Sequence, residues 1–471
     1  MRTLHVVSHT HWDREWYRTF QQFRLRLVEL VDGLLEILKA DKQYKFFMLD
    51  GQTIILDDYL AMRPENEKVL RDHIRAGRIL IGPWHILPDM FLVSPEAHIR
   101  NLLEGDRTAR KFGPKMMIGY MPDSFGHFAQ MPQLIRNFGM DVISLWRGPD
   151  DQPAEFWWDA PDGSRVLMAY LRDSYSNGAS LQASIPPKFA QGLKLAGDSL
   201  ASHSATSDYL IMFGTDHMQP SRETSKTIAY ANAALRNTKV IHSTLPNYVR
   251  AIKAQIARRK LQLPIYSGEF RSSKHSHLLP GVLSTRIWIK QRNQSCENLL
   301  EKWAEPFSTF ASLAASGHAP HPMIHDPSSI LHNAWHLLME CHPHDSVCGC
   351  SIDQVHEEMK PRFDQVEQIG EELTRQSLDA LAASIKTDGD SSSIIHPPSS
   401  IIVFNPSPFI RTDLVSIELS LPIGVQDFDV LDEKGNLIPH QSTNGHVSDL
   451  INVNVPRGEL GGLIGMVHEG R

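Results

Sequence analysis

Residues 5–16 carry closely spaced side chains that could bind a divalent metal. The run reads HVVSHTHWDREW, and His11 and Asp13 follow an apolar stretch that predicts a short buried strand. In a parallel α/β protein, ligands bind in the crevice outside the carboxyl ends of the strands. Neutral imidazole and ionised carboxylate groups are ligands that suit zinc. A polar loop whose histidines only cap backbone groups would show the same spacing, so both alternatives stay open on this motif alone.

Residues 1–270 must position these groups, and their pattern predicts a catalytic α/β domain. Apolar runs alternate with stretches of helical periodicity, which predicts a parallel (β/α)7 barrel-like fold, with one β-hairpin at residues 156–171. Other polar residues that follow predicted strands are Asp50, Asp89, Asp123, Arg147 and Asp216. Because the carboxyl ends of parallel strands meet at one face, we expect these side chains to line one site.

The pattern changes after residue 270. Residues 271–386 show helical periodicity without strands, which predicts a three-helix bundle domain. Residues 387–400, TDGDSSSIIHPPSS, have the composition of a linker. Apolar and polar residues then alternate, which predicts that an antiparallel β-domain begins at 401–471. Because this β-region is short, we expect the chain to be a C-terminally truncated form of something longer.

Composition excludes several classes of function. The net charge of −7 and the absence of a basic tract argue against nucleic-acid or anionic-membrane partners. No run approaches the roughly 18 uninterrupted apolar residues of a membrane span, and the first strand leaves no room for a signal peptide. The four cysteines, Cys296, Cys341, Cys348 and Cys350, do not form a disulfide framework. We therefore expect a cytoplasmic protein.

The loop at residues 341–350, CHPHDSVCGC, allows two interpretations. Its cysteines and a histidine would suit a closed tetrahedral structural metal site, although the spacing matches neither paired CxxC motifs nor a zinc finger. Alternatively, His344, with Asp345 beside it, completes the site at the strand ends, and the cysteines are small buried packing residues.

Asp123 and Asp216 lie on separate predicted strand ends. Asp123 belongs to GYMPDSFGHFAQMP and Asp216 to LIMFGTDH. Glycosidic cleavage requires two carboxylic groups, one that attacks or activates water and one that protonates the leaving oxygen. Asp123 could instead cap the following helix, which is a common role for Asp.

Five motifs in this order resemble glycoside hydrolase family 38. They are HTHWDREW, GYMPDSFGHFAQMP, LIMFGTDH, LLPGVLSTRIWIKQRNQSCENLLEKWAEP and CHPHDSV. Members of this family are zinc-dependent retaining α-mannosidases, and the bacterial branch that includes mannosylglycerate hydrolase-like enzymes is the most similar. The resemblance covers the chain up to the β-region.

The resemblance implies a role for each matching residue. One Zn²⁺ per chain would be held by His11, Asp13, Asp123 and His344. Asp123 would also be the nucleophile, and Asp216 the general acid/base. Substrate contacts would come from Trp16, Asp89, Arg147 and Asp345. The substrate would be a mannoside or a small mannosylglycerate-like compound. Since Asp216 must start protonated, we expect a partly apolar pocket and nearby carboxylates to raise its pKa.

Two other functions remain open from the sequence. The chain could be an inactive sugar-binding remnant of such an enzyme, because members of the family usually continue well past this length. It could also be a metal-dependent deacetylase or amidohydrolase, which shares the HxHxD motif but does not need Asp216. The sequence leaves open the linkage, the aglycone, the choice of divalent metal and the oligomeric state, a homo-oligomer included.

Overall fold

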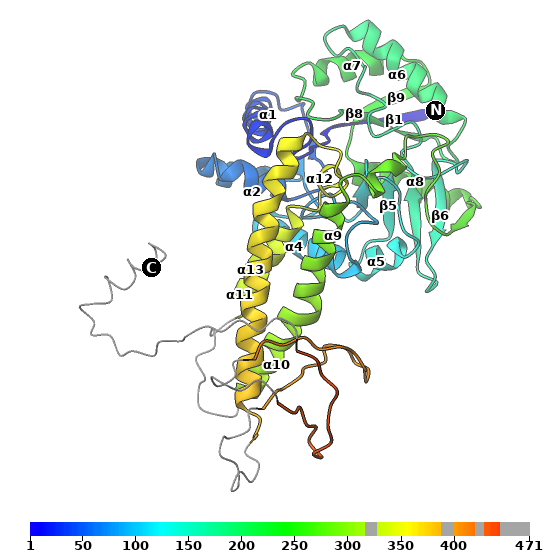
Figure 1. Ribbon diagram of the computed structural model, residues 1–471. Coiled ribbons are helices and arrows are strands. Elements are labelled where there is room, and N and C mark those ends of the chain that lie inside the picture. The colour runs from blue at the N-terminus through cyan, green and yellow to red at the C-terminus, as the bar shows by residue number, and fades with distance from the viewer. Residues whose placement is uncertain (316–326, 388–399, 420–427, 443–471) are drawn as a thin grey trace. The chain divides into compact units, whose positions relative to one another are not determined.

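The computed structural model describes residues 1–315, 327–387, 400–419 and 428–442. The chain divides into two compact units, Met1–Pro408 and Phe409–Arg471. The first unit contains the sheets, the long helices and every predicted site residue (Figure 1).

The first sheet is organised around β1. Its strands are β1 (Arg2–Thr10), β2 (Phe47–Leu49), β3 (Ile79–Leu80), β8 (Asp208–Phe213) and β9 (Thr238–His242). They follow the order β3-β2-β1-β8, with β9 also paired to β1, and every pair is parallel. Residues 4–10 of β1 are all buried, as expected for a parallel strand that is covered on both faces.

The second sheet contains the predicted hairpin. Its strands are β4 (Gly119–Met121), β5 (Val142–Leu145), β6 (Glu155–Asp159), β7 (Arg165–Ala169) and β10 (Ile265–Ser267). They follow the order β10-β6-β7-β5-β4, and only β6 and β7 are antiparallel. The hairpin prediction is therefore confirmed, with Gly163 in the turn at a φ of 85° that favours glycine.

The coarse prediction of an α/β fold with parallel sheets is confirmed, but a seven-stranded barrel is not. The described strands pair into two five-stranded sheets, and within the described residues no strand of one sheet pairs with a strand of the other. Periodicity locates apolar strands along the chain. It does not identify the neighbour of each strand, because pairing is a tertiary property.

Helices cover the sheets in the amino-terminal part of the first unit. They are α1 (Phe20–Ala40), α2 (Ile54–Leu60), α3 (Glu67–Arg75), α4 (Pro95–Phe112), α5 (Met131–Asn137), α6 (Pro186–Ala201), α7 (Thr224–Ala234), α8 (Leu245–Arg259) and the short 3₁₀ helix η1 (Pro64–Asn66). The apolar stripe of α1 is buried, as its three- and four-residue spacing predicts. Ser94 caps α4 by accepting a hydrogen bond from the Ala97 N–H, and Pro95 occupies the first helical position.

Long helices follow residue 280. The elements are η2 (Pro280–Leu283), α9 (Ile287–Asn298), the π-helical turn η3 (Leu299–Ala304), α10 (Glu305–Ala315), α11 (Pro327–Met339), α12 (His344–Val347) and α13 (Asp353–Ala383). In Figure 1, α13 runs beside α10 and α11, and it packs on both. The apolar cluster of these helices also includes Val93 and Phe125 from the amino-terminal part. A separate bundle domain at 271–386 therefore stays a prediction.

The predicted β-domain is not found in the residues that are described. Most of the linker predicted at 387–400 lies outside them, while 401–419 and 428–442 contain a single isolated antiparallel bridge, Leu431 to Leu437, and no strand. Apolar side chains there such as Ile410 and Leu414 are fully exposed. Alternation alone does not make a strand, because the backbone also needs a partner to pair with.

No described helix is long and apolar enough to cross a membrane.

Candidate active site and metal centre

His11 and Asp13 immediately follow β1. The backbone of His11 forms a parallel bridge with that of Asp216, which follows β8. This requires β1 and β8 to approach closely at their ends. A Cβ atom on Gly214 would lie 2.0 Å from the carbonyl oxygen of His9, so the approach needs glycine. The strand ends thus bring Asp216 beside the opening motif.

Asp50, at the end of β2, orients the His11 ring. One of its carboxylate oxygens lies 3.1 Å from His11 Nδ1 and accepts hydrogen bonds from the Trp12 N–H at 3.1 Å and Gln52 Nε2 at 2.9 Å. This contact directs His11 Nε2 toward Asp13, and such a carboxylate partner typically fixes a metal-binding histidine. Asp50 follows a predicted strand, but nothing in the sequence assigned it a role of its own.

The loop before α12 brings His344 to the same place. The His344 N–H donates to the Leu87 carbonyl oxygen at 3.3 Å, and Pro343 forms a bridge with Pro88. These contacts fasten the loop to the segment that follows β3. The ring of Phe125 packs edge-on against His344, with their centroids 5.5 Å apart.

Glu15 connects the opening motif to the helices that carry His344. Its buried carboxylate accepts a 2.8 Å hydrogen bond from Ser346 Oγ in α12. It also accepts two hydrogen bonds from Arg362 in α13, at 2.8 and 2.6 Å. Burial raises the pKa of Glu15, but Arg362 more than offsets this and keeps it ionised. No sequence pattern singled out Glu15.

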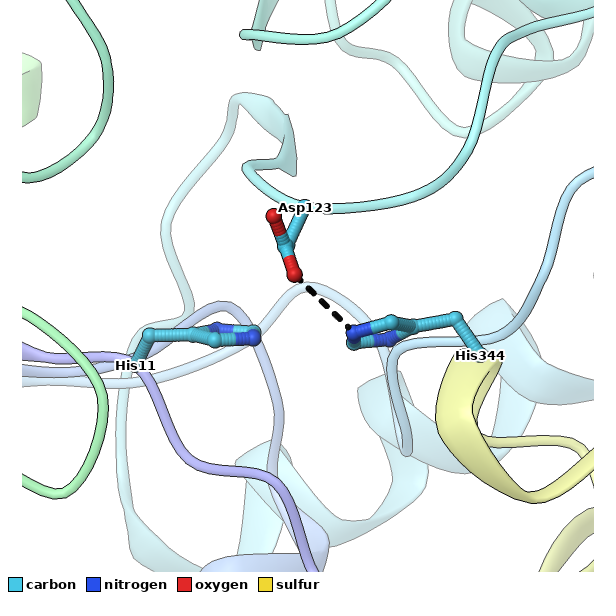
Figure 2. Close-up of side chains that lie close together, drawn as sticks. All are labelled: His11, Asp123 and His344. Atoms are coloured by element: carbon cyan, nitrogen blue, oxygen red, sulfur yellow. Dashed lines mark ion pairs between the residues drawn. The ribbon is translucent and has the colours of Figure 1, made fainter. Parts of the chain in front are cut away.

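The four predicted metal ligands converge in the structure. His344 Nε2 lies 3.4 Å from a carboxylate oxygen of Asp13 and 3.4 Å from one of Asp123. His11 Nε2 lies 3.0 Å from the same oxygen of Asp13. Figure 2 shows the Asp123 carboxylate between the facing rings of His11 and His344. Residues separated by more than 300 positions therefore meet around one point.

These residues fit a divalent cation. His11 Nε2, His344 Nε2 and Asp13 Oδ1 are buried, and within the described part of the chain none of them has a hydrogen-bond partner. Unsatisfied buried polar atoms are costly, and native proteins rarely keep them without a bound group or water. Two imidazoles and two carboxylates form a donor set suited to zinc. The carboxylates of Asp13 and Asp123 would also balance its charge.

Asp345 adds negative charge beside the ligands. Its carboxylate lies 3.8 Å from His344 Nε2 and accepts a hydrogen bond from Cys350 Sγ at 3.1 Å. Burial alone would lower the pKa of His344, but the neighbouring carboxylates, first among them Asp345, raise it to about 9. The surroundings thus favour positive charge at this point.

Asp123 and Asp216 differ in their electrostatic surroundings. Burial would raise the pKa of Asp123, but the adjacent His344 imidazole and the charge of Arg147, 2.7 Å away, lower it overall. Burial raises the pKa of Asp216, and the nearby carboxylates add to this shift. The Tyr175 hydroxyl donates to Asp216 at 2.8 Å. The elevated pKa predicted for Asp216 agrees with the structure, whereas nothing in the sequence indicated Tyr175.

Of the predicted substrate contacts, Arg147 and Asp345 border the ligands, whereas Trp16 and Asp89 make other contacts. Both carboxylate oxygens of Asp89 are engaged, by the N–H groups of Phe91 and Leu92 at 2.8 Å and by Cys348 Sγ at 3.3 Å. The half-buried ring of Trp16 packs edge-on against Tyr17, with their centroids 4.9 Å apart. A sugar contact by any of these residues stays a prediction.

The cysteine-based structural metal site receives no support. All four cysteines are free, and Cys341 and Cys348 are buried in the apolar cluster of the helices. Among the described residues, no cysteine belongs to a group placed to hold a metal. Burial also raises the pKa of the Cys341 thiol to about 12, which disfavours the thiolate that a metal needs.

Comparison with known families is consistent with this geometry. The pattern of the glycosyl hydrolases family 38 N-terminal domain matches residues 1–269. The chain belongs to glycosyl hydrolase family 38. A second family pattern, the alpha mannosidase middle domain, matches residues 277–381 of this family 38 chain.

Relatives of the family 38 chain are longer than the chain itself. It is 38% identical over 411 residues to "Putative mannosylglycerate hydrolase" from Halalkalibacterium halodurans, across 84% of this chain and 44% of that protein. It is 25% identical to human alpha-mannosidase 2C1, across 88% of this chain and 37% of that one. The crystal structure of an alpha-mannosidase from Enterococcus faecalis superposes with a TM-score of 0.74 at 34% identity, covering 81% of this chain and 43% of that one. The chain thus spans less than half the length of these relatives.

Proposed function

We propose that this chain carries the zinc-binding and catalytic residues of a retaining α-mannosidase. One observation supports this most strongly: buried atoms of His11, Asp13 and His344 that lack a hydrogen-bond partner among the described residues face one another beside the Asp123 carboxylate. Membership of glycosyl hydrolase family 38 supports the same activity. The four ligands in the proposal are the two histidines and the two aspartates of this group.

The two carboxylic groups would divide the reaction between them. A carboxylate oxygen of Asp123 attacks the anomeric carbon as the glycosidic C–O bond breaks, and Asp216 gives its proton to the leaving oxygen. Water then attacks the anomeric carbon, Asp216 takes a proton from it, and Asp123 is released. Arg147 holds Asp123 ionised and in position at 2.8 Å. Bound zinc would supply a template and Lewis acid for the sugar hydroxyls.

The proposed substrates are terminal α-mannosides, including small compounds like mannosylglycerate. The 38% identity with the "Putative mannosylglycerate hydrolase" from Halalkalibacterium halodurans supports the proposal of mannosylglycerate-like substrates. We also propose a reducing, cytoplasmic compartment, because all four cysteines are free.

Hydrolysis of p-nitrophenyl α-mannoside and mannosylglycerate by the purified 471-residue chain tests the proposal. We expect activity that a chelator abolishes and added Zn²⁺ restores. Asp123→Asn should lose at least about 10³-fold in kcat. Asp141→Asn is the matched control, because this exposed carboxylate lies at the surface and pairs with Lys253, away from the proposed site. NMR of the first product should show the α-anomer if configuration is retained.

Each other outcome contradicts a named part of the proposal. Zinc and mannose binding without turnover would make the chain a sugar-binding remnant. If both mannosides stay intact while the chain releases acetate from an acetylated sugar, or ammonia from an amide, the deacetylase or amidohydrolase class would be favoured. Initial formation of the β-anomer would exclude Asp123 as a nucleophile.

A further inference from the structure

A second group of metal-ligand side chains lies outside the site described above. Its members are Asp57 in α2, His85 in the segment that follows β3, and His336 in α11. One ligand atom from each residue lies within 4.8 Å of the other two. The ligand atoms of His11, Asp123 and His344 lie within the same distance of one another. No step of the proposed mannosidase reaction uses these three residues.

His85 provides the observation that points to a ligand. The side chain is completely buried, and neither ring nitrogen has a hydrogen-bond partner within the described part of the chain. Its ring lies against that of His336, with the two planes tilted by 59° and their centroids 4.8 Å apart. Burial lowers the pKa of His85, so the imidazole is neutral and keeps a free lone pair. A buried imidazole with two unsatisfied nitrogens is costly unless another group binds it.

The other two members give this group access to solvent. Asp57 lies at the surface, and the His336 side chain is 31% exposed. An ion could therefore enter from that side, and water could complete its coordination. The cluster also lies at a junction, because α2 and α11 are far apart in sequence and His85 comes from a third segment.

We propose that Asp57, His85 and His336 hold a second divalent transition-metal ion, of which Zn²⁺ is the type ion. Two imidazoles and one carboxylate with a water in the fourth position form a known zinc coordination. Ligand atoms around tetrahedral zinc lie about 3.3 Å apart, so the partly exposed side chains of His336 and Asp57 must rotate inward. The ion joins α2, the segment after β3 and α11, and it acts as a structural clamp.

Metal stoichiometry tests this proposal. The full chain is saturated with Zn²⁺, passed over a desalting column with a weak chelator, and analysed by plasma mass spectrometry. We expect two ions in the wild type, one in His336→Ala and one in Asp57→Asn. His332→Ala is the matched control, because His332 lies one turn earlier in α11 and is outside the group. This variant should keep two ions.

The variant Asp13→Asn separates the two sites. It should lose the ion of the catalytic group and keep the one at His336, and Asp13→Asn/His336→Ala should bind none. In Asp13→Asn, Zn²⁺ can bind only at the second site, and it should raise the Tm. The double variant Asp13→Asn/His336→Ala should bind Zn²⁺ at least tenfold more weakly and show no Tm shift. The proposal would be overturned if the wild type binds one ion and His336→Ala still binds one. It would also be overturned if His336→Ala and Asp57→Asn each still bind two ions.

Discussion

Asp123 and Asp216 are chemically identical side chains whose pKa values their surroundings shift in opposite directions. His344 and Arg147 stabilise the charged form of Asp123. Burial and neighbouring carboxylates disfavour the charged form of Asp216. A nucleophile must be ionised and a general acid must be protonated, so this difference is what assigns the two roles in the proposed reaction.

Asp216→Asn should separate substrates by the quality of their leaving group. A glyceryl oxygen needs protonation as it leaves, whereas p-nitrophenolate does not. We therefore expect kcat/KM for mannosylglycerate to fall about 10²–10⁴-fold, with a much smaller loss for glycosylation by p-nitrophenyl α-mannoside. Pre-steady-state kinetics of both substrates measure this, with Asp141→Asn as control. An equal loss for both substrates would contradict the acid role.

Glu297 in α9 should make folding stability depend on pH. It is 1% exposed, and burial raises its pKa to about 7 although the Ser94 N–H donates to it at 2.8 Å. The native state therefore binds this proton more tightly than the unfolded state does. The contribution is fully present below the unfolded pKa, and it is lost as pH rises to about 7.

Glu297→Gln should remove this dependence. Relative to the wild type, its free energy of unfolding should rise between pH 5 and 7.5 by an amount on the order of 3 kcal/mol. Urea denaturation at several pH values measures the difference. Glu371→Gln, at an exposed position of α13, is the matched control. A flat difference for Glu297→Gln would show that the buried carboxyl does not titrate in this range.

At the scale of elements, α12 and α13 must be held against β1 for His344 to reach Asp13. The buried Glu15 carboxylate does this, because Ser346 and Arg362 both donate to it. Asp50 has the equivalent function for the other histidine, His11. The metal site is thus positioned by contacts between elements, not by the local structure of any one loop.

Arg362→Met should destabilise the protein because it leaves the Glu15 charge buried and unpaired. We expect a loss of about 3–5 kcal/mol by urea denaturation, together with weaker Zn²⁺ binding at His344. Adding Glu15→Gln should recover part of the loss. Arg375→Met is the control on the same helix, because its ion pairs are exposed and such surface pairs contribute little to stability. Equal losses in the two arginine variants would contradict the anchoring role.

At the scale of the whole first unit, the proposed catalytic ion joins the amino-terminal sheets to the helical part. Ligands come from the ends of β1 and β4 and from α12. An ion that binds only the folded chain stabilises it by an amount that depends on its concentration and affinity.

Chelation should therefore lower thermal stability as well as activity. In the His336→Ala background, removal of Zn²⁺ should lower the Tm by about 5 °C or more, since binding at a thousandfold excess over Kd contributes about 4 kcal/mol. Differential scanning calorimetry measures the shift. In Asp13→Asn/His336→Ala the chelator should have no effect. An unchanged Tm, with metal analysis confirming that the ion was removed, would contradict this coupling.

The sequence alone determined the residue types and the fact that they follow the carboxyl ends of the strands. Strand periodicity predicted that His11, Asp13, Asp123 and Asp216 follow strands, and parallel strands bring such ends together. The helical periodicity and the β6–β7 hairpin were likewise local properties of the chain. The ligand role of His344, in contrast, came from family resemblance, because its loop had two possible uses.

Only the tertiary structure decided which groups touch. It gave His344 its place beside Asp13, Asp50 its contact with His11 and Glu15 its contact with Arg362. It also grouped Asp57, His85 and His336 from three separate segments. Hydrophobic periodicity records which face of an element is buried, but it carries no information on its neighbour. That choice depends on packing and on the pairing of buried polar groups across the whole chain.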